Sequence, residues 1–139
     1  MAWANNGATP TIRALRNTDR ETLSYILDYL QDSPVYEMVT VGDRKFLLVH
    51  GGIKDFEKGK PLHEYTAHDF LWTRPSLSDR YFDDITTIIG HTPTQYYGSC
   101  YTGRALVTDT WIDIDTGAAA GGSPMLLRLD DMKEFYADN

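Results

Sequence analysis

The spacing of apolar residues predicts a helix near the N-terminus. In the segment TDRETLSYILDYLQDSP, apolar residues recur every three or four positions, which places them on one face of a helix. These residues are Leu23, Ile26, Leu27 and Leu30. Thr18 and Glu21 have the spacing of a capping box at the start of this helix, and Pro34 lies past its end.

The rest of the chain has the shorter patterns of strands. VYEMVTVGDRKFLLVH contains two strand-like runs around Gly42-Asp43, which predicts a hairpin whose second strand runs into His50. ITTIIG predicts a buried strand, because it is apolar and β-branched. ALVTDTWIDID, PMLLRLD and MKEFYA predict further strands, and the polar and aromatic segment 54–75 predicts a loop with a short helix. The pattern is typical of an α+β protein and argues against a doubly wound parallel fold, since βαβ alternation does not appear.

Length and charge restrict the classes of protein. With 139 residues, the chain is expected to form a single domain, 1–139. Its net charge of −7 argues against nucleic acid or an anionic membrane as a partner, because the few Lys and Arg residues are scattered. The sequence has no run of about 18 apolar residues that could span a bilayer. Cys100 is the only cysteine, so an internal disulfide cannot form and a reducing cytoplasm is expected.

Two histidines follow apolar strands beside glycine, in KFLLVHGGI and in ITTIIGHTPT. Glycine lets the backbone turn sharply at the end of a strand and lets a ligand approach closely. A neutral imidazole in this position suits a divalent metal near pH 7. His50 and His91 are therefore candidate metal ligands. A single histidine of this kind is more often a hydrogen-bonded structural residue, and two of them in one small domain favour the metal interpretation more.

Five motifs occur in a fixed order along the chain. They are WANNGATPT, LLVHGGI, LWTRP, IIGHTPT and IDIDTGAAAGG. This series resembles the downstream part of the phosphoprotein-phosphatase family of calcineurin-like metallophosphoesterases, which carry W-x-x-N-G-G-x-x-T, H-G-G or H-A-G, L-W-x-R, G-H-T and I-D-T-G. Bacterial and phage-type serine/threonine phosphatases and symmetrical diadenosine tetraphosphate hydrolases are the most similar members. The resemblance extends from Trp3 to about Leu129.

The resemblance implies a set of site residues. His50 and His91 match the two histidines that ligate one metal of the family's dinuclear centre. Arg74 matches an arginine that binds the substrate phosphate, a role suited to a planar guanidinium that is always charged. Asn6 matches the asparagine of the N-G loop and is the second expected phosphate-binding residue, although Ala8 replaces the loop's second glycine.

The resemblance also implies a fold and an activity. The expected fold is an α+β sandwich of two packed mixed sheets flanked by helices. The expected activity of the intact enzyme is hydrolysis of phosphomonoesters by metal-bound hydroxide, with two divalent ions drawn from manganese, iron, zinc or magnesium. The substrate would be a phosphoprotein or a small phosphoester. A diadenosine tetraphosphate hydrolase-like activity is the alternative.

The sequence lacks the family's upstream motifs G-D-x-H-G, G-D-x-x-D-R-G and G-N-H-[DE]. The segment Gly42-Asp43-Arg44 does not replace them, because Lys-Phe follows it within the predicted hairpin. We therefore expect the chain to be the C-terminal part of a metallophosphoesterase domain whose N-terminal portion is missing, and to be inactive alone. Strand edges left open by the missing portion would favour a homo-oligomer. The competing hypothesis is a non-catalytic domain with a binding or regulatory role.

Two other constellations have unsuitable spacing. His63 and His68 are five positions apart, which on a helix turns them roughly 140° from each other, so they would not share a metal there. Cys100 and Arg104 are too close in sequence for the phosphate loop of a cysteine phosphatase, and a small, partly buried thiol is expected instead.

Acidic and aromatic residues near the C-terminus admit two interpretations each. Period-2 spacing puts Asp109, Asp113 and Asp115 on one face of a strand, where they could recruit a cation. The favoured interpretation is that the first two are solvated and that Asp115 shapes a turn with Gly117. Three tyrosines could line a substrate groove or, as we expect, cover the core. They are Tyr96, Tyr97 and Tyr101.

Overall fold

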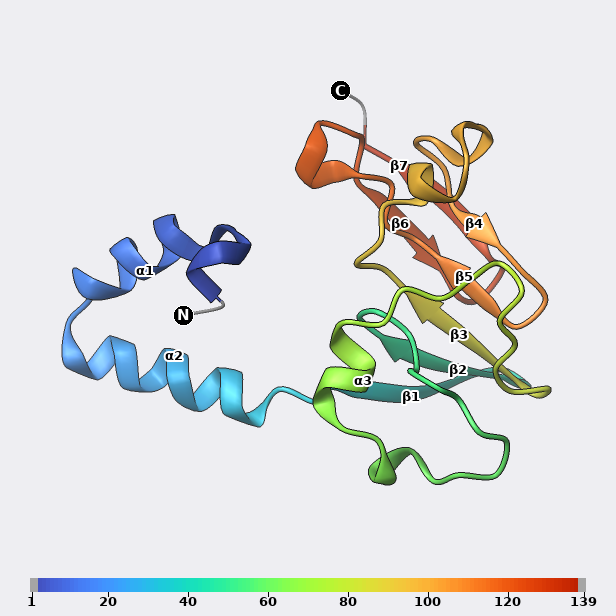
Figure 1. Cartoon of the computed structure of the whole chain (residues 1–139), viewed down its shortest axis with the longest axis horizontal. Coiled ribbons are helices and arrows are strands. Elements are labelled where there is room, and N and C mark those ends of the chain that lie inside the picture. Colours follow the sequence, from blue (N-terminus) through green and yellow to red (C-terminus); the bar gives the residue numbers. More distant parts are fainter. Residues whose placement is uncertain (1–2, 138–139) are drawn as a thin grey trace. The chain divides into compact units, whose positions relative to one another are not determined.

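The structure is a computed structural model that describes residues 3–137, and it belongs to the mixed α+β class (Figure 1). The chain divides into two compact units, Met1–Pro34 and Val35–Asn139. The first unit is helical and the second contains the described strands.

The helical unit contains a kinked segment, Ala4–Ala8, followed by α1, Thr9–Arg16, and α2, Arg20–Asp32. The predicted helix is confirmed as α2, but the predicted capping box is wrong. Asp19 is the N-cap, and its carboxylate accepts the Thr22 N–H at 2.9 Å. An aspartate caps a helix better than a threonine does, so the helix begins one residue later than predicted.

The second unit is built on a five-stranded mixed sheet of order β1-β2-β3-β5-β4. Its strands are β1 Tyr36–Val41, β2 Arg44–Val49, β3 Ile85–Ile89, β4 Leu106–Val107 and β5 Trp111–Asp113. The central strands β2, β3 and β5 are parallel, and the edge strands β1 and β4 are antiparallel to their neighbours. The carboxyl ends of the three parallel strands therefore lie at one edge of the sheet.

The predicted hairpin and buried strand are both present. β1 and β2 pair with Val41 opposite Arg44, around the two-residue loop Gly42-Asp43. Gly42 has a φ of 60°, a conformation that glycine adopts without steric cost. The segment ITTIIG forms β3, in the centre of the sheet.

The predicted strand ALVTDTWIDID is wrong as a single element, because it is divided into β4 and β5 by a turn at 108–110. The Thr108 hydroxyl accepts the Trp111 N–H at 3.0 Å and donates to the Trp111 carbonyl at 2.8 Å, which closes the turn. Threonine competes in this way with a continuous strand. Asp109 and Asp113 therefore do not share a strand face: Asp109 lies in the turn, and Asp113 is fully buried.

The two faces of the sheet are covered differently. On one face, Leu47, Ile89 and Trp111 form a core with Phe70, which belongs to the short helix α3, Ala67–Leu71. The segment 54–75 thus contains the predicted loop and short helix, with a further turn of 3₁₀-helix at Leu62–Glu64.

On the opposite face, Phe46, Ile88 and Ile112 pack against Met125 and Leu127. Met125 and Leu127 belong to β6, Met125–Arg128, which pairs with β7, Lys133–Tyr136, in a second, two-stranded sheet. The last two predicted strands are thus confirmed. Three short 3₁₀-helices connect the remaining elements, at Thr94–Tyr97, Ser99–Tyr101 and Ala118–Ala120.

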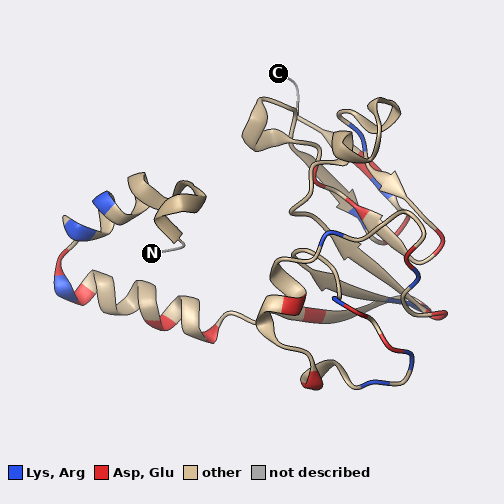
Figure 2. Cartoon of the chain, viewed as in Figure 1, with Lys and Arg blue, Asp and Glu red and all other residues tan. Residues whose placement is uncertain are grey.

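Lys and Arg are distributed among acidic residues along the chain (Figure 2). Among residues 3–137, no helix combines the length and the apolar character needed to cross a bilayer.

Candidate metal and phosphate site

His50 and His91 lie together, although 41 positions separate them. His50 directly follows β2, and His91 follows β3 after Gly90, so both lie at the edge of the sheet where parallel strands end. The Gly90 N–H donates to the His50 carbonyl at 2.8 Å and continues the pairing of the strands. His50 Nε2 is 2.9 Å from His91 Nδ1, and the ring centroids are 4.7 Å apart.

The glycines after His50 are required by close packing. A Cβ atom on Gly51 would lie 2.8 Å from the Thr73 carbonyl oxygen and 3.0 Å from the Phe70 carbonyl oxygen. The Gly51 N–H donates to that Phe70 oxygen at 2.8 Å. Gly52 has a φ of 137°, and a Cβ atom there would lie 2.7 Å from the Tyr81 hydroxyl. The Gly-Gly pair thus lets the 70–75 segment approach the end of β2.

The backbone of His91 is in a conformation that is uncommon for a residue with a side chain. Its φ is 67°, in the left-handed region. The residues on both sides are fixed: the Ile114 N–H donates to the Ile89 carbonyl, and the Thr94 N–H donates to the Asp115 carbonyl. The surrounding hydrogen bonds therefore hold the His91 loop in a strained backbone conformation, as is often found at functional sites.

Arg74 reaches the same loop. Its guanidinium donates to the Thr92 hydroxyl at 2.9 Å, and Thr92 is the residue after His91. No carboxylate within residues 3–137 forms an ion pair with Arg74, whose side chain is exposed. The guanidinium donors that do not bond Thr92 are therefore available to bind an anion.

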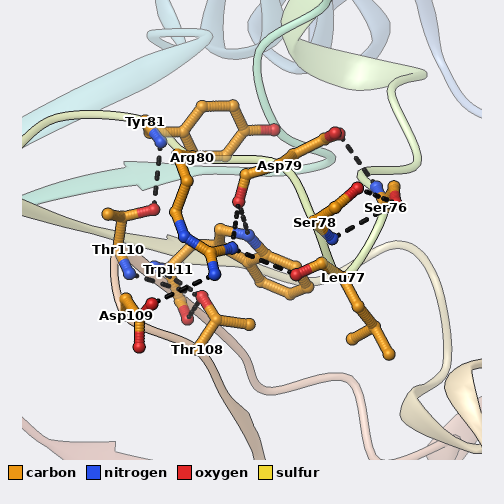
Figure 3. A network of polar contacts seen from close by, with 10 residues as sticks. All are labelled: Ser76, Leu77, Ser78, Asp79, Arg80, Tyr81, Thr108, Asp109, Thr110 and Trp111. Atoms are coloured by element: carbon orange, nitrogen blue, oxygen red, sulfur yellow. Dashed lines mark hydrogen bonds and ion pairs between the residues drawn. The ribbon is translucent and has the colours of Figure 1, made fainter.

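A network of polar contacts anchors the segment that follows Arg74 (Figure 3). The Asp79 carbonyl accepts the indole N–H of the fully buried Trp111 at 3.2 Å and a guanidinium N–H of Arg80 at 3.0 Å. Arg80 also forms a 3.0 Å ion pair with Asp109. This network joins the 76–81 segment to the turn between β4 and β5, and so restrains the chain that carries Arg74.

The electrostatic surroundings favour a neutral His91. Burial lowers its pKa, the positive charges of Arg74 and His50 lower it further, and Asp115 opposes them. Its Nε2 atom is buried and has no hydrogen-bond partner among the described residues. A neutral imidazole has a lone pair to offer an ion, and the lowered pKa keeps that form present at a lower pH than usual.

The two facing nitrogens fit a shared ion. Ligand nitrogens on one zinc-sized ion lie roughly 3–3.5 Å apart, so the separation of 2.9 Å needs only a small movement of either ring. Without an ion, one of the two nitrogens donates a hydrogen bond to the other. In residues 3–137, His, Cys, Asp and Glu form no group of three or more that could hold a metal. The pair thus supplies two ligands of a centre that needs more.

Two further side chains flank the histidine pair. Trp72 is half exposed, and its ring packs edge-on against His91 with centroids 5.6 Å apart. His68 stacks on Trp72 at 6.4 Å. His63 lies in a separate 3₁₀-turn and His68 lies in α3, so the two histidines do not share the single helix that was considered for them.

Several residues differ from their expected environments. Cys100 is exposed, not partly buried, because the short 3₁₀-helix that carries it lies at the surface. Tyr97 and Tyr101 pack against the core as expected, whereas Tyr96 is 75% exposed. Asn6 belongs to the helical unit, where Gly7 has a φ of 83° and Ala8 is buried.

The predicted turn at Asp115 is present, since its carboxylate accepts the Gly117 N–H at 3.0 Å. The prediction that Asp113 is solvated is wrong. Its side chain is 0% exposed, and β5 is an inner strand that lies between β3 and β4. Strand periodicity gave no signal for this burial, since the burial depends on which segments pack over the sheet face.

No protein-family model and no curated protein matches this sequence.

Proposed function

We propose that the chain is the C-terminal part of a calcineurin-like metallophosphoesterase of the phosphoprotein-phosphatase type. In this proposal, His50 and His91 are ligands of one divalent metal, Arg74 binds the substrate phosphate, and the other ligands of the two-metal centre come from outside residues 3–137. The substrate is a phosphomonoester of a protein or of a small molecule.

One observation carries the proposal: the imidazole nitrogens of His50 and His91 face each other at 2.9 Å, with Arg74 bonded to the residue after His91. The motifs HGG, LWTRP and GHT are far apart in the sequence, and the resemblance predicts that they meet. Their meeting at one sheet edge supports the family assignment, because a structural role for each histidine would not require it.

Each residue has a definite task in this proposal. The lowered pKa of His91 keeps its lone pair available for the metal near neutral pH. The Thr92 hydroxyl accepts one N–H of Arg74 and orients the guanidinium, whose other donors bind phosphate oxygens in pairs. Divalent ions at such a centre stabilise negative charge on the phosphoryl group and lower the pKa of bound water.

The second candidate is a non-catalytic domain of the same fold that binds a ligand or regulates a partner. It is favoured by the small number of ligands within residues 3–137, where two histidines meet without a third His, Cys, Asp or Glu. In this case the chain would bind a metal or phosphate weakly and would support no hydrolysis in any context.

The proposal is tested by the binding of inorganic phosphate with and without Mn²⁺, measured by isothermal titration calorimetry. We expect Mn²⁺ to strengthen phosphate binding by about tenfold or more, which corresponds to about 1.4 kcal/mol. His91→Ala and Arg74→Ala should each abolish this gain. His63→Ala and Arg104→Ala are matched controls at exposed positions outside the site and should retain it.

A gain that persists in both His91→Ala and Arg74→Ala would overturn the proposal, because the ion and the phosphate would then bind elsewhere. Absence of any coupling between Mn²⁺ and phosphate in the unmodified chain would favour the non-catalytic candidate.

A further inference from the structure

Asp113 is a carboxylic acid inside the sheet that forms no ion pair with any residue of 3–137. It ends β5, is 0% exposed, and lies in register between Ile89 of β3 and Leu106 of β4. Its Oδ1 atom accepts the Asp115 N–H at 2.9 Å. Its Oδ2 atom is buried and has no hydrogen-bond partner in residues 3–137, where no Lys, Arg or His forms an ion pair with it.

The segment that Asp113 holds is joined directly to the His91 loop. The Asp115 carbonyl accepts the Thr94 N–H at 2.8 Å, and the Ile114 N–H donates to the Ile89 carbonyl at 2.9 Å. These two bonds lie on either side of His91 in the sequence. A carboxyl group that fixes the Asp115 backbone therefore also fixes both anchors of the His91 loop.

The surroundings favour the protonated form of Asp113. Burial raises its pKa to about 7, the Asp115 N–H opposes this, and the negative charge of Asp115 adds to it. The phenol of Tyr97 is a further titratable group nearby, and burial together with the charge of Asp113 raises the pKa of that phenol to about 12. The charges of Arg74 and Asp79 reach Tyr97 with opposite effects on its pKa.

We propose that Asp113 is a positioning residue for the metal ligand His91: its carboxyl group holds the Asp115 turn, and this turn holds the His91 loop. The role of Asp113 as a support for a metal ligand rests on the proposed function. The hydrogen bonds that link Asp113 to the His91 loop exist without a metal and can be measured in the metal-free chain.

Two substitutions separate positioning from general stability. Asp113→Asn keeps a neutral group of the same shape whose oxygen can accept the Asp115 N–H. Asp113→Val fills the same space but leaves that N–H without an acceptor. Thr87→Val is the matched control, since Thr87 is also 0% exposed and its buried hydroxyl has no hydrogen-bond partner in the described part of the chain.

The first readout is amide hydrogen exchange in the metal-free chain. Because a partly buried N–H without a partner costs about 1–3 kcal/mol, Asp113→Val should lower the protection of the Thr94 and Ile114 amides by about tenfold or more. Amides of the β1–β2 hairpin should keep their protection. At pH 4, where Asp113 is protonated in the folded chain, Asp113→Asn and Thr87→Val should match the unmodified chain within about threefold, which corresponds to about 0.65 kcal/mol.

The second readout is the affinity for Zn²⁺ by calorimetry at pH 6.5, with the same pattern expected: about a tenfold loss in Asp113→Val and rescue in Asp113→Asn. Protected Thr94 and Ile114 amides in Asp113→Val would overturn the positioning role, as would an equal loss of protection throughout the sheet. If the unmodified chain binds no Zn²⁺, only the zinc readout fails. That result overturns the proposed function and the role of Asp113 in supporting a metal ligand, while hydrogen exchange still tests whether Asp113 holds the His91 loop.

Discussion

A methyl group placed on Gly51 should destabilise the fold and separate the two histidines. In the Gly51→Ala variant, the new Cβ atom would lie 2.8 Å from the Thr73 carbonyl oxygen and 3.0 Å from the Phe70 carbonyl oxygen. Both neighbours are backbone atoms, so the two segments must move apart. The movement would also lengthen or break the 2.8 Å hydrogen bond from the Gly51 N–H to Phe70.

The magnitude follows from these contacts. Inserting a methyl group into a closely packed site costs about 1–3 kcal/mol, and losing a backbone hydrogen bond costs about 1 kcal/mol. We therefore expect the free energy of unfolding to fall by about 2–4 kcal/mol. Affinity for Zn²⁺ should fall as well, because Gly51 directly follows His50 and the displacement moves that imidazole away from His91.

Gly90→Ala is the matched control, since Gly90 adjoins the other histidine. A Cβ atom there would lie 3.8 Å from the His50 carbonyl oxygen and 3.9 Å from the Asp115 Cβ atom, which are ordinary contacts. Urea denaturation followed by tryptophan fluorescence measures both variants. Gly90→Ala should change stability by less than about 1 kcal/mol. The packing explanation fails if Gly51→Ala is equally benign, or if both substitutions are equally damaging.

Three other outcomes are expected. In urea denaturation, Asp113→Asn should have the same free energy of unfolding as the unmodified chain near pH 4 and a value about 4 kcal/mol higher at pH 8. The reason is that burial raises the pKa of Asp113 from 3.8 to about 7, so the unmodified chain loses stability as the pH rises through that range. Equal pH dependence in both proteins would refute this. Trp111→Phe should lower the free energy of unfolding by about 1–3 kcal/mol, since it removes the indole N–H that the Asp79 carbonyl accepts, and a Trp3→Phe variant in the helical unit serves as its control. The chain alone should not hydrolyse p-nitrophenyl phosphate with excess Mn²⁺, and turnover that His91→Ala abolishes would contradict the need for ligands from outside residues 3–137.

Local patterns predicted the strands that carry the histidines, but not the sheet that unites them. Alternation and the Gly42-Asp43 turn were sufficient for β1 and β2, because hairpin pairing is local. The parallel pairing of β2 with β3 is not local: the crossover between them contains the short helix α3 and one turn of 3₁₀-helix, and no long amphipathic helix that a sequence pattern would reveal.

The candidate site was predictable in its residues and not in its supports. The motifs around His50, Arg74 and His91 suggested that these side chains meet, and the distances agree with that expectation. The burial of Asp113 depends on tertiary packing around the end of β5, and the turn at 108–110 depends on one threonine hydroxyl. Strand periodicity contains neither piece of information. The predicted acidic face is therefore absent, because Asp109 lies in the turn and Asp113 is buried.

The most direct test of the metal site is a titration of the chain with Zn²⁺ at pH 7, followed through the imidazole resonances of its four histidines by NMR. We expect the signals of His50 and His91 to shift together and to saturate at one ion per chain, while His63 and His68 change little. The shifts should weaken as the pH is lowered, because protonated imidazole does not bind metal. Unchanged His50 and His91 signals, or shifts of similar size in all four histidines, would contradict a metal site at this edge of the sheet.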